Sequence, residues 1–113
     1  MLLKLFLYQL LCIQLYLVRA FEPDDVRTVS ELISTKGYAV EEHDVHTDDG
    51  YILRMQRIPC GLDKCRNDKA QRPPVILQHG IIDTAADWVL NGANQSLGFI
   101  LADAGFDVWL GNF

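Results

Sequence analysis

Residues 73–112 read PPVILQHGIIDTAADWVLNGANQSLGFILADAGFDVWLGN, and this stretch decides the fold. Residues 75–77 form a continuous apolar run without alternation, which is typical of a strand covered on both faces in a parallel sheet. Ser96 is placed to cap a helix that ends at Gly105, and FDVWL (106–110) is a second short apolar strand. A strand, a helix and a strand within about 40 residues predict a βαβ unit with a right-handed crossover.

The end of the first strand is unusual, because the apolar run stops at Gln78, His79 and Gly80 and resumes at Ile81 and Ile82. In open α/β sheets, ligands bind beyond the carboxyl ends of the strands. Gly80 allows a sharp turn that leaves the following backbone N–H groups free to face a cavity. Fixed N–H dipoles in a dry site stabilise an oxyanion, and the two isoleucines would exclude water. The sequence therefore predicts a binding site for a negatively charged oxygen at this turn.

Two elements precede this unit. FEPDDVRTVSELISTKGY (21–38) predicts an amphipathic helix docked on its own domain, with Asp24 or Asp25 as its cap and Gly37 as its left-handed stop. Residues 38–59 predict a β-hairpin around a turn at 48–50, whose carboxylates do not match the ligand spacing of a calcium loop. Residues 60–74 are polar, charged and proline-ended, as in a surface loop.

Cys60 and Cys65 lie within this loop, in CGLDKC. In an oxidising compartment this pair can close a small local disulfide. The alternatives are two unpaired thiols, or two cysteines whose partners lie outside this chain. A single Cys pair without a second Cys or His pair cannot fill the four ligand positions of a zinc site, so we expect no metal.

The first 20 of the 113 residues, MLLKLFLYQLLCIQLYLVRA, have the pattern of a secretory signal peptide. Lys4 supplies the early positive charge, and Val18 and Ala20 occupy the small-residue positions of a cleavage site. The alternative is a membrane anchor, but the apolar stretch is shorter than the roughly 20 residues that a bilayer requires. Losing Lys4 and Arg19 on cleavage would change the net charge from −5 to −7. This acidic balance argues against nucleic acid as a partner.

Residues 73–112 and YAVEEHDVHTDDGYILRMQRIP (38–59) together resemble the N-terminal part of the acid lipases, a group of secreted and lysosomal α/β-hydrolases that includes gastric lipase. Nearly all of the chain after residue 20 takes part in the resemblance, and the motifs occur in the family's order. In that family the residue after "HG" donates its backbone N–H to the oxyanion hole. The resemblance therefore implies that Ile81 is this donor, where relatives usually have leucine.

The resemblance also shows which parts of the catalytic apparatus this sequence lacks. α/β-Hydrolases carry their nucleophile in a G-x-S-x-G elbow, followed by Asp or Glu and then His. No serine of this chain has the flanking glycine pair, and the three histidines all precede the place where the elbow would arise. For His79 we expect a structural role, or a role in holding the backbone of the turn, rather than direct catalysis. Gly80 is expected to act with it in shaping this turn.

Three further residues are candidates for lesser roles. Trp88, with Ile82, is placed to line an acyl pocket, although aromatic core packing explains Trp88 equally well. Asn94 opens NQS, an N-glycosylation acceptor in a secretory protein, and its alternative is an unmodified surface asparagine. Trp109 sits in a strand, where we expect it to be core.

The sequence thus predicts an incomplete α/β fold, the N-terminal part of an α/β-hydrolase, ending at residue 113. We expect a signal peptide (1–20), a lipase-associated segment (21–72) and the start of the hydrolase core (73–113). The complete protein would be a secreted or lysosomal lipase that hydrolyses acylglycerols or sterol esters at a lipid–water interface without a cofactor, and the 113 residues alone would be inactive. The alternative is a non-catalytic lipase-like protein that binds apolar ligands or partners.

Overall fold

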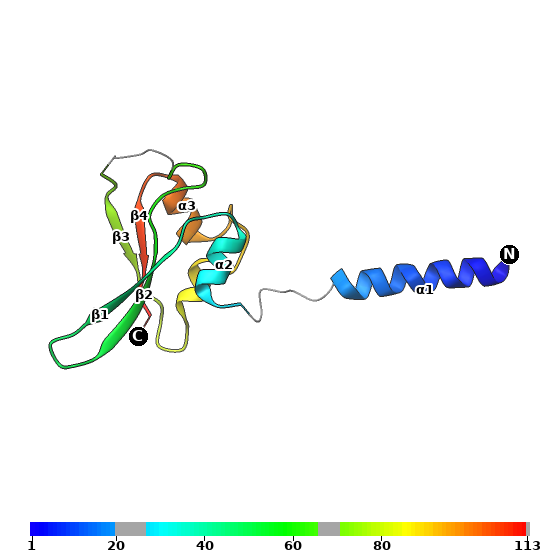
Figure 1. The fold of residues 1–113 in the computed structure, drawn as a ribbon, viewed down its shortest axis with the longest axis horizontal. Coiled ribbons are helices and arrows are strands. Elements are labelled where there is room, and N and C mark those ends of the chain that lie inside the picture. The colour runs from blue at the N-terminus through cyan, green and yellow to red at the C-terminus, as the bar shows by residue number, and fades with distance from the viewer. Residues whose placement is uncertain (20–26, 66–70, 113) are drawn as a thin grey trace.

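The computed structural model describes residues 1–19, 27–65 and 71–112, whose arrangement is shown in Figure 1. Four strands form one sheet in the order β1-β2-β4-β3. The strands are β1 (Glu41–His46), β2 (Ile52–Ile58), β3 (Pro74–Leu77) and β4 (Asp107–Leu110). The helical elements are α1 (Leu2–Arg19), α2 (Val29–Thr35), the 3-10 helix η2 (Ala85–Trp88) and α3 (Leu97–Asp103).

The pairing of the strands confirms the predicted α/β class, in which a hairpin is followed by a βαβ unit. β1 and β2 pair antiparallel, with His46 opposite Ile52, and the turn between them contains Gly50 at a φ of 91°. β3 and β4 pair in parallel, and α3 lies between them in the chain. β2 joins the two units because its end pairs antiparallel with β4.

The hydrophobic core lies on one face of this sheet, where α2, η2 and α3 are packed (Figure 1). Along β4, Val108 and Leu110 alternate with less buried residues and are themselves fully buried. Phe99 of α3 lies beneath them with its ring centroid 4.4 Å from that of Tyr38. Fully burying a side chain of this size contributes about 1.5–3 kcal/mol, so the packing of this layer of helices on the sheet stabilises the fold.

Both short helices end as the sequence predicts, at glycines with positive φ. Gly37 follows α2 at a φ of 86°, and Gly105 follows α3 at 101°. At α3 the N–H groups of Gly105 and Phe106 bond the carbonyls of Ala102 and Leu101, which is a Schellman motif. A β-carbon would be strained at these φ values, so glycine is the residue that allows the reversal.

The start of α2 differs from the predicted cap. Asp24 and Asp25 lie outside the described residues, and the described helix begins at Val29 with Thr28 as its N-cap. Thr28 Oγ1 accepts the N–H of Glu31 at 3.3 Å, and the Glu31 carboxylate accepts the N–H of Thr28 at 2.8 Å. The hydrogen bonds that this carboxylate accepts from the N–H and then from the hydroxyl of Thr28 lower the pKa of Glu31. This capping box is visible in the sequence as TVSE.

Ser96 occupies the predicted N-cap position of α3 but does not cap the helix with its side chain. Instead its buried hydroxyl donates a hydrogen bond of 2.9 Å to the carbonyl of Asn91. The serine therefore fastens the preceding loop to the start of α3.

The opposite face of the sheet corrects two predictions about burial. Ile76 of β3 is 67% exposed, so β3 is not covered on both faces in this chain. Trp109 is not in the core cluster, because it alternates with the buried Val108 and Leu110 and must point away from the helices. Its ring lies 5.1 Å from the guanidinium carbon of Arg57 and 4.9 Å from the ring of His43.

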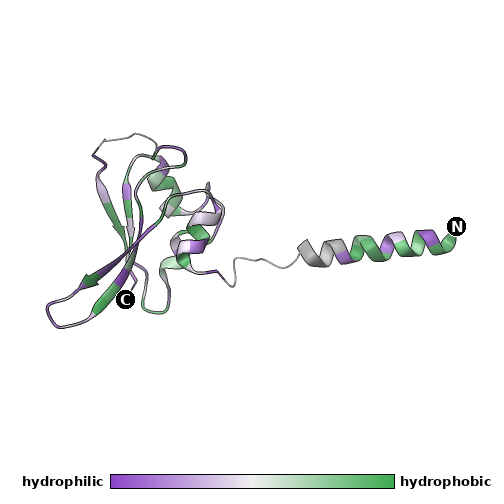
Figure 2. Cartoon of the chain, in the orientation of Figure 1, coloured by the Kyte–Doolittle hydropathy of each residue, from purple (hydrophilic) through white to green (hydrophobic). Residues whose placement is uncertain are grey.

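The N-terminal helix α1 stands apart from the sheet in Figure 1, and its apolar residues are interrupted by polar ones in Figure 2. The side chains of residues 1–14 are exposed. Over the described part of the chain, no helix combines the length and apolar character that a membrane crossing requires. The signal peptide at residues 1–20 and the boundaries at 72 and 73 remain predictions.

Candidate active site

The turn after β3 lies where two parallel strands end. The N–H of Gly111, just after β4, bonds the carbonyl of Leu77 at the end of β3, at 3.0 Å. Three residues after Leu77 the chain reverses in a β-turn from Gly80 to Asp83, closed by a 3.2 Å hydrogen bond from the N–H of Asp83 to the carbonyl of Gly80. We call residues 78–84 the β3 turn. It occupies the edge of the sheet at which open α/β proteins bind ligands.

Ile81 and Ile82 are the two central residues of the β-turn from Gly80 to Asp83, and both are exposed. Ile81 and Ile82 are 102% and 91% exposed. Among residues 27–65 and 71–112, neither of their N–H groups has a hydrogen-bond acceptor. The two isoleucines are therefore not buried against a wall in this chain, and their N–H groups are available to an acceptor that approaches the turn.

His79 is bonded to the backbone of the same turn. Its Nδ1 lies 2.7 Å from the carbonyl oxygen of Gly80. Its Nε2 is buried, with no partner among the described residues. The histidine thus contacts the peptide group that precedes Ile81.

The structure does not support the reason that the sequence suggests for a glycine at position 80. Its φ is not positive, so the turn itself does not demand glycine. A β-carbon at Gly80 would instead meet Oδ2 of Asp83 at 2.8 Å. Because that oxygen is the end of a flexible side chain, the constraint on residue 80 is weaker than expected.

The structure does not bring Ile82 and Trp88 together in one pocket. Ile82 points into solvent, whereas Trp88 is partly buried in η2 and packs against the core cluster. The indole Nε1 of Trp88 is buried without a hydrogen-bond partner in the described chain. Core packing is therefore the role of Trp88 that these contacts support.

Comparison with known proteins decides the family. Residues 29–92 match the family model of a partial α/β-hydrolase lipase region. Over 93 residues the chain is 55% identical to human lysosomal acid lipase/cholesteryl ester hydrolase, which covers 82% of this chain and 23% of that protein. It is 52% identical to mouse lipase member M over 94 residues, and 51% identical to human gastric triacylglycerol lipase over 90 residues. These matches cover 83% and 80% of this chain, and 22% of each relative.

The chain belongs to the acid lipase family. It spans less than a quarter of the length of these relatives, and the matched region includes β1, β2, β3 and the β3 turn. The α/β-hydrolase fold predicted from the sequence is thereby confirmed for this chain.

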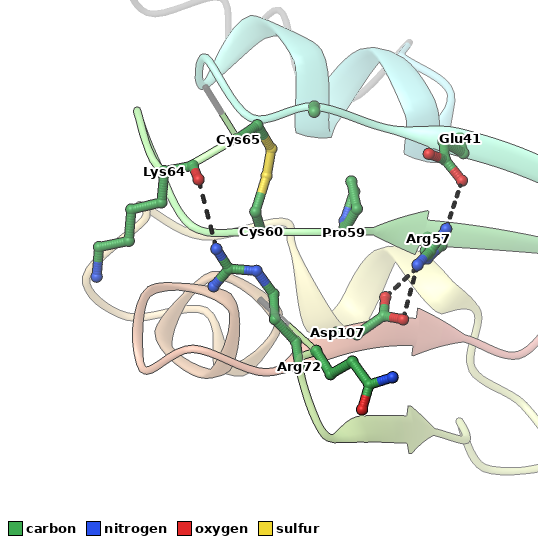
Figure 3. Close-up of a pocket in the computed structure, with 10 residues that line it drawn as sticks. Glu41, Arg57, Pro59, Cys60, Lys64, Cys65, Arg72 and Asp107 are labelled. Atoms are coloured by element: carbon green, nitrogen blue, oxygen red, sulfur yellow. Dashed lines mark hydrogen bonds and ion pairs between the residues drawn. A yellow bond between two sulfur atoms is a disulfide. The ribbon is translucent and has the colours of Figure 1, made fainter. Parts of the chain in front are cut away.

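The opposite end of the parallel strands in this acid lipase segment holds a polar cavity of about 720 Å³, shown in Figure 3. Arg57 bonds Asp107 through two nitrogens, at 2.7 and 2.9 Å, and Glu41 at 3.0 Å. Burial raises the pKa of Asp107, but the hydrogen bond from Arg57 and further polar contacts outweigh it, so the pKa is lowered overall. The hydrogen bonds that Arg57 donates to Asp107 raise the pKa of Arg57. The charges of this cavity are thus largely paired.

Asp103, at the end of α3, ties this end of the sheet together. Its carboxylate accepts hydrogen bonds from the hydroxyl of Tyr38 at 2.7 Å and from the N–H of Leu62 at 2.9 Å. Its carbonyl accepts one from Nζ of Lys64 at 2.6 Å. Burial, and then the hydrogen bond to Asp103, raise the pKa of Tyr38 to about 12. We call Tyr38, the loop 60–65 and Asp103 the Asp103 cluster. No pattern in the sequence predicts it, because its members lie far apart in the chain.

The two cysteines of the loop lie in this cluster. Cys60 and Cys65 form a disulfide in the structure, with a Cα–Cα distance of 5.5 Å (Figure 3). Among the described residues, no group of three or more His, Cys, Asp and Glu side chains is placed to hold a metal ion. That the two thiols are oxidised in the secreted protein stays a prediction.

Asn94, the predicted glycosylation acceptor, lies in an exposed turn before α3. Its side chain is open to solvent, as a glycan requires. The third residue of the acceptor sequence is the buried Ser96, so modification would have to precede folding of this loop.

Proposed function

We propose that this chain is the N-terminal part of a secreted or lysosomal lipase that hydrolyses acylglycerols or sterol esters through an acyl-serine intermediate. The observation that carries the proposal is the β3 turn, whose Ile81 N–H has no acceptor among the described residues and lies at the carboxyl ends of two parallel strands. Two of the similar proteins have names that describe a triacylglycerol lipase and a cholesteryl ester hydrolase, which supports the substrate class.

In the proposed reaction, a serine supplied by the rest of the enzyme attacks the ester carbonyl and forms a tetrahedral intermediate. The carbonyl oxygen then carries a negative charge, and the Ile81 N–H donates a hydrogen bond to it. A second donor lies next to the nucleophile, as is usual for this fold. Since the sequence contains no G-x-S-x-G elbow, we expect the 113 residues alone to bind no acyl group covalently.

The exposed Ile81 and Ile82 suit an apolar substrate. In the complete enzyme their side chains would contact the acyl chain or the segment that covers it. Excluding water there would strengthen the hydrogen bond to the oxyanion. No cofactor and no nucleic acid take part in this proposal.

A chimera tests the proposal. Residues 27–112 replace the matching segment of human lysosomal acid lipase/cholesteryl ester hydrolase, and hydrolysis of a soluble ester and of an emulsified triacylglycerol is measured. We expect the chimera to hydrolyse both, with the unmodified relative as the control. A folded chimera that binds an apolar substrate analogue but hydrolyses neither ester would instead support the binding-protein alternative.

The secretory route has its own test. In mammalian cells, the secreted product should begin near Phe21, and Asn94→Gln should increase its electrophoretic mobility. A product that retains Met1, or an unchanged mobility, would contradict the respective claim.

A further inference from the structure

The Gly80–Ile81 peptide group carries both the carbonyl that His79 contacts and the N–H assigned to the oxyanion. No described peptide bond is cis, and in a planar trans peptide the C=O and the N–H point in opposite directions. Whatever holds the carbonyl of Gly80 therefore also fixes the direction of the Ile81 N–H. The direction in which the Ile81 N–H points is thus set by the hydrogen bonds of the Gly80 carbonyl.

Two donors hold this carbonyl. The N–H of Asp83 closes the turn at 3.2 Å, which is the long end of the range for such bonds. Nδ1 of His79 lies closer, at 2.7 Å. The shorter contact comes from the residue just before the peptide, so it restrains the peptide plane independently of how well the turn closes.

The contact also assigns the protons of the imidazole. A carbonyl oxygen can only accept, so Nδ1 must carry the hydrogen, and in the neutral ring Nε2 then has a lone pair. Nε2 is buried without a partner among the described residues. In the other tautomer, a proton on Nε2 would therefore have no acceptor there. The surroundings of the ring thus favour the tautomer in which Nδ1 donates.

We propose that His79 is a positioning residue for the oxyanion donor, which holds the Gly80 carbonyl through Nδ1–H so that the Ile81 N–H faces the reacting oxygen. This inference rests on the proposed function, and it adds the residue that sets the direction of the donor. His79 touches neither the substrate nor the nucleophile in this role.

The first test does not depend on catalysis. In the full chain labelled with ¹⁵N-histidine, long-range ¹H–¹⁵N correlation should show His79 with a protonated Nδ1 and an unprotonated Nε2. The spectrum of His79→Gln identifies the signals, because His43 and His46 remain. A His79 ring protonated only on Nε2 would overturn the inference.

The second test uses the chimera. His79→Phe keeps the ring but loses the donor, whereas His79→Asn keeps an N–H donor at the same number of bonds from the backbone. We expect His79→Phe to lower kcat by about 10- to 100-fold with little change in KM, because a misplaced catalytic group costs about this much. His79→Asn should recover part of the loss. His46→Phe, which changes an exposed histidine at the end of β1, should leave kcat unchanged.

A readout specific to the oxyanion separates positioning from general damage. Sulfur is a weak hydrogen-bond acceptor, so an enzyme that uses N–H donors prefers an ester over its thiono analogue. This preference should fall in His79→Phe and return in His79→Asn. Unchanged kcat in folded His79→Phe, or equal losses on both substrates without rescue by Asn, would overturn the inference. A folded but inactive chimera would overturn the proposed function as well, whereas the wrong tautomer in an active one would overturn the role of His79 alone.

Discussion

The two ends of the parallel strands β3 and β4 differ in how completely their polar groups are hydrogen-bonded. At the amino end, Asp103 accepts three hydrogen bonds, and a disulfide closes the loop beside it. At the carboxyl end, the β3 turn leaves the N–H groups of Ile81 and Ile82 without acceptors in the described chain. A group whose hydrogen bonds are complete can stabilise the fold but has nothing left for a ligand. The difference indicates which end is structural and which is available for chemistry.

The largest effect is expected at the carboxyl end. Ile81→Pro removes the N–H, and in the chimera it should lower kcat by about 10² to 10³, or about 2.7–4 kcal/mol. Ile81→Leu keeps the N–H and should stay near the rate of the unsubstituted chimera. Steady-state hydrolysis of a soluble ester measures both, after thermal unfolding has shown that each variant folds. Normal turnover by a folded Ile81→Pro variant would contradict the proposal that the carboxyl end of β3 supplies the oxyanion donor.

Substituting one glycine at each end compares how tightly the two ends are packed. A β-carbon at Gly61 would lie 2.7–2.9 Å from atoms of Asp103 and Ala102, two of them backbone, whereas one at Gly80 meets only the end of the Asp83 side chain. Overpacking typically costs 1–3 kcal/mol, so we expect about 3 kcal/mol for Gly61→Ala and less than about 1 kcal/mol for Gly80→Ala. Urea unfolding of the chain gives both values. Equal losses would show that the amino end is not the more tightly packed one.

The disulfide should matter for stability and not for turnover. In the chain-entropy account, closing a loop of this size contributes about 2 kcal/mol. Replacing both Cys60 and Cys65 by serine should therefore lower the urea midpoint of the chain while leaving kcat of the chimera unchanged. Peptide mapping without reduction should find the two cysteines joined. Alkylation of both thiols before any reduction would contradict the pairing.

The smallest effect concerns acid. The hydrogen bond from His43, and then that from Arg57, lower the pKa of Glu41 below its ordinary 4.5, and the pKa of Asp107 lies below 3.8. Carboxyls with lowered pKa values stabilise the fold above their unfolded pKa and lose that contribution as the pH falls through the folded one. Arg57→Met should cost about 1 kcal/mol at neutral pH, since Arg57 is partly exposed.

The pH dependence of that cost is the informative part. The difference between Arg57→Met and the unsubstituted chain should shrink as the pH falls through the lowered pKa values of Glu41 and Asp107, because protonation removes the charges that Arg57 pairs with. Urea unfolding at neutral pH and at about pH 2 measures it. A cost that is the same at both pH values would mean that Arg57 acts by packing on Trp109 rather than through its charge.

Local chemistry made much of the fold readable from the sequence. The turn at 48–50 gives the hairpin, Gly37 and Gly105 end the helices, and the strand–helix–strand pattern gives the parallel pair. Each of these depends on residues close together in the chain. The capping box of Thr28 and Glu31 was equally local, but the aspartates upstream offered competing caps.

Contacts distant in sequence explain what could not be read. Asp103 forms hydrogen bonds with Tyr38, 65 positions away in the sequence, and with Leu62, 41 positions away. No sequence pattern predicts either contact. Alternation in β4 shows that Trp109 and Val108 face opposite ways, but not which face the helices cover. For the β3 turn, the sequence predicted a turn after the strand, and the resemblance to the acid lipases implied Ile81 as the donor, which stays a prediction. The sequence did not reveal that His79 bonds the carbonyl of the same peptide.

The most direct test of the central claim is a crystal structure of the chimera inhibited by an alkyl phosphonate, whose phosphoryl oxygen mimics the oxyanion. We expect this oxygen to lie about 2.7–3.1 Å from the backbone nitrogen of Ile81. A phosphonate bonded to the serine, with its oxygen turned away from Ile81 and outside hydrogen-bonding distance, would contradict the assignment of the β3 turn to the oxyanion.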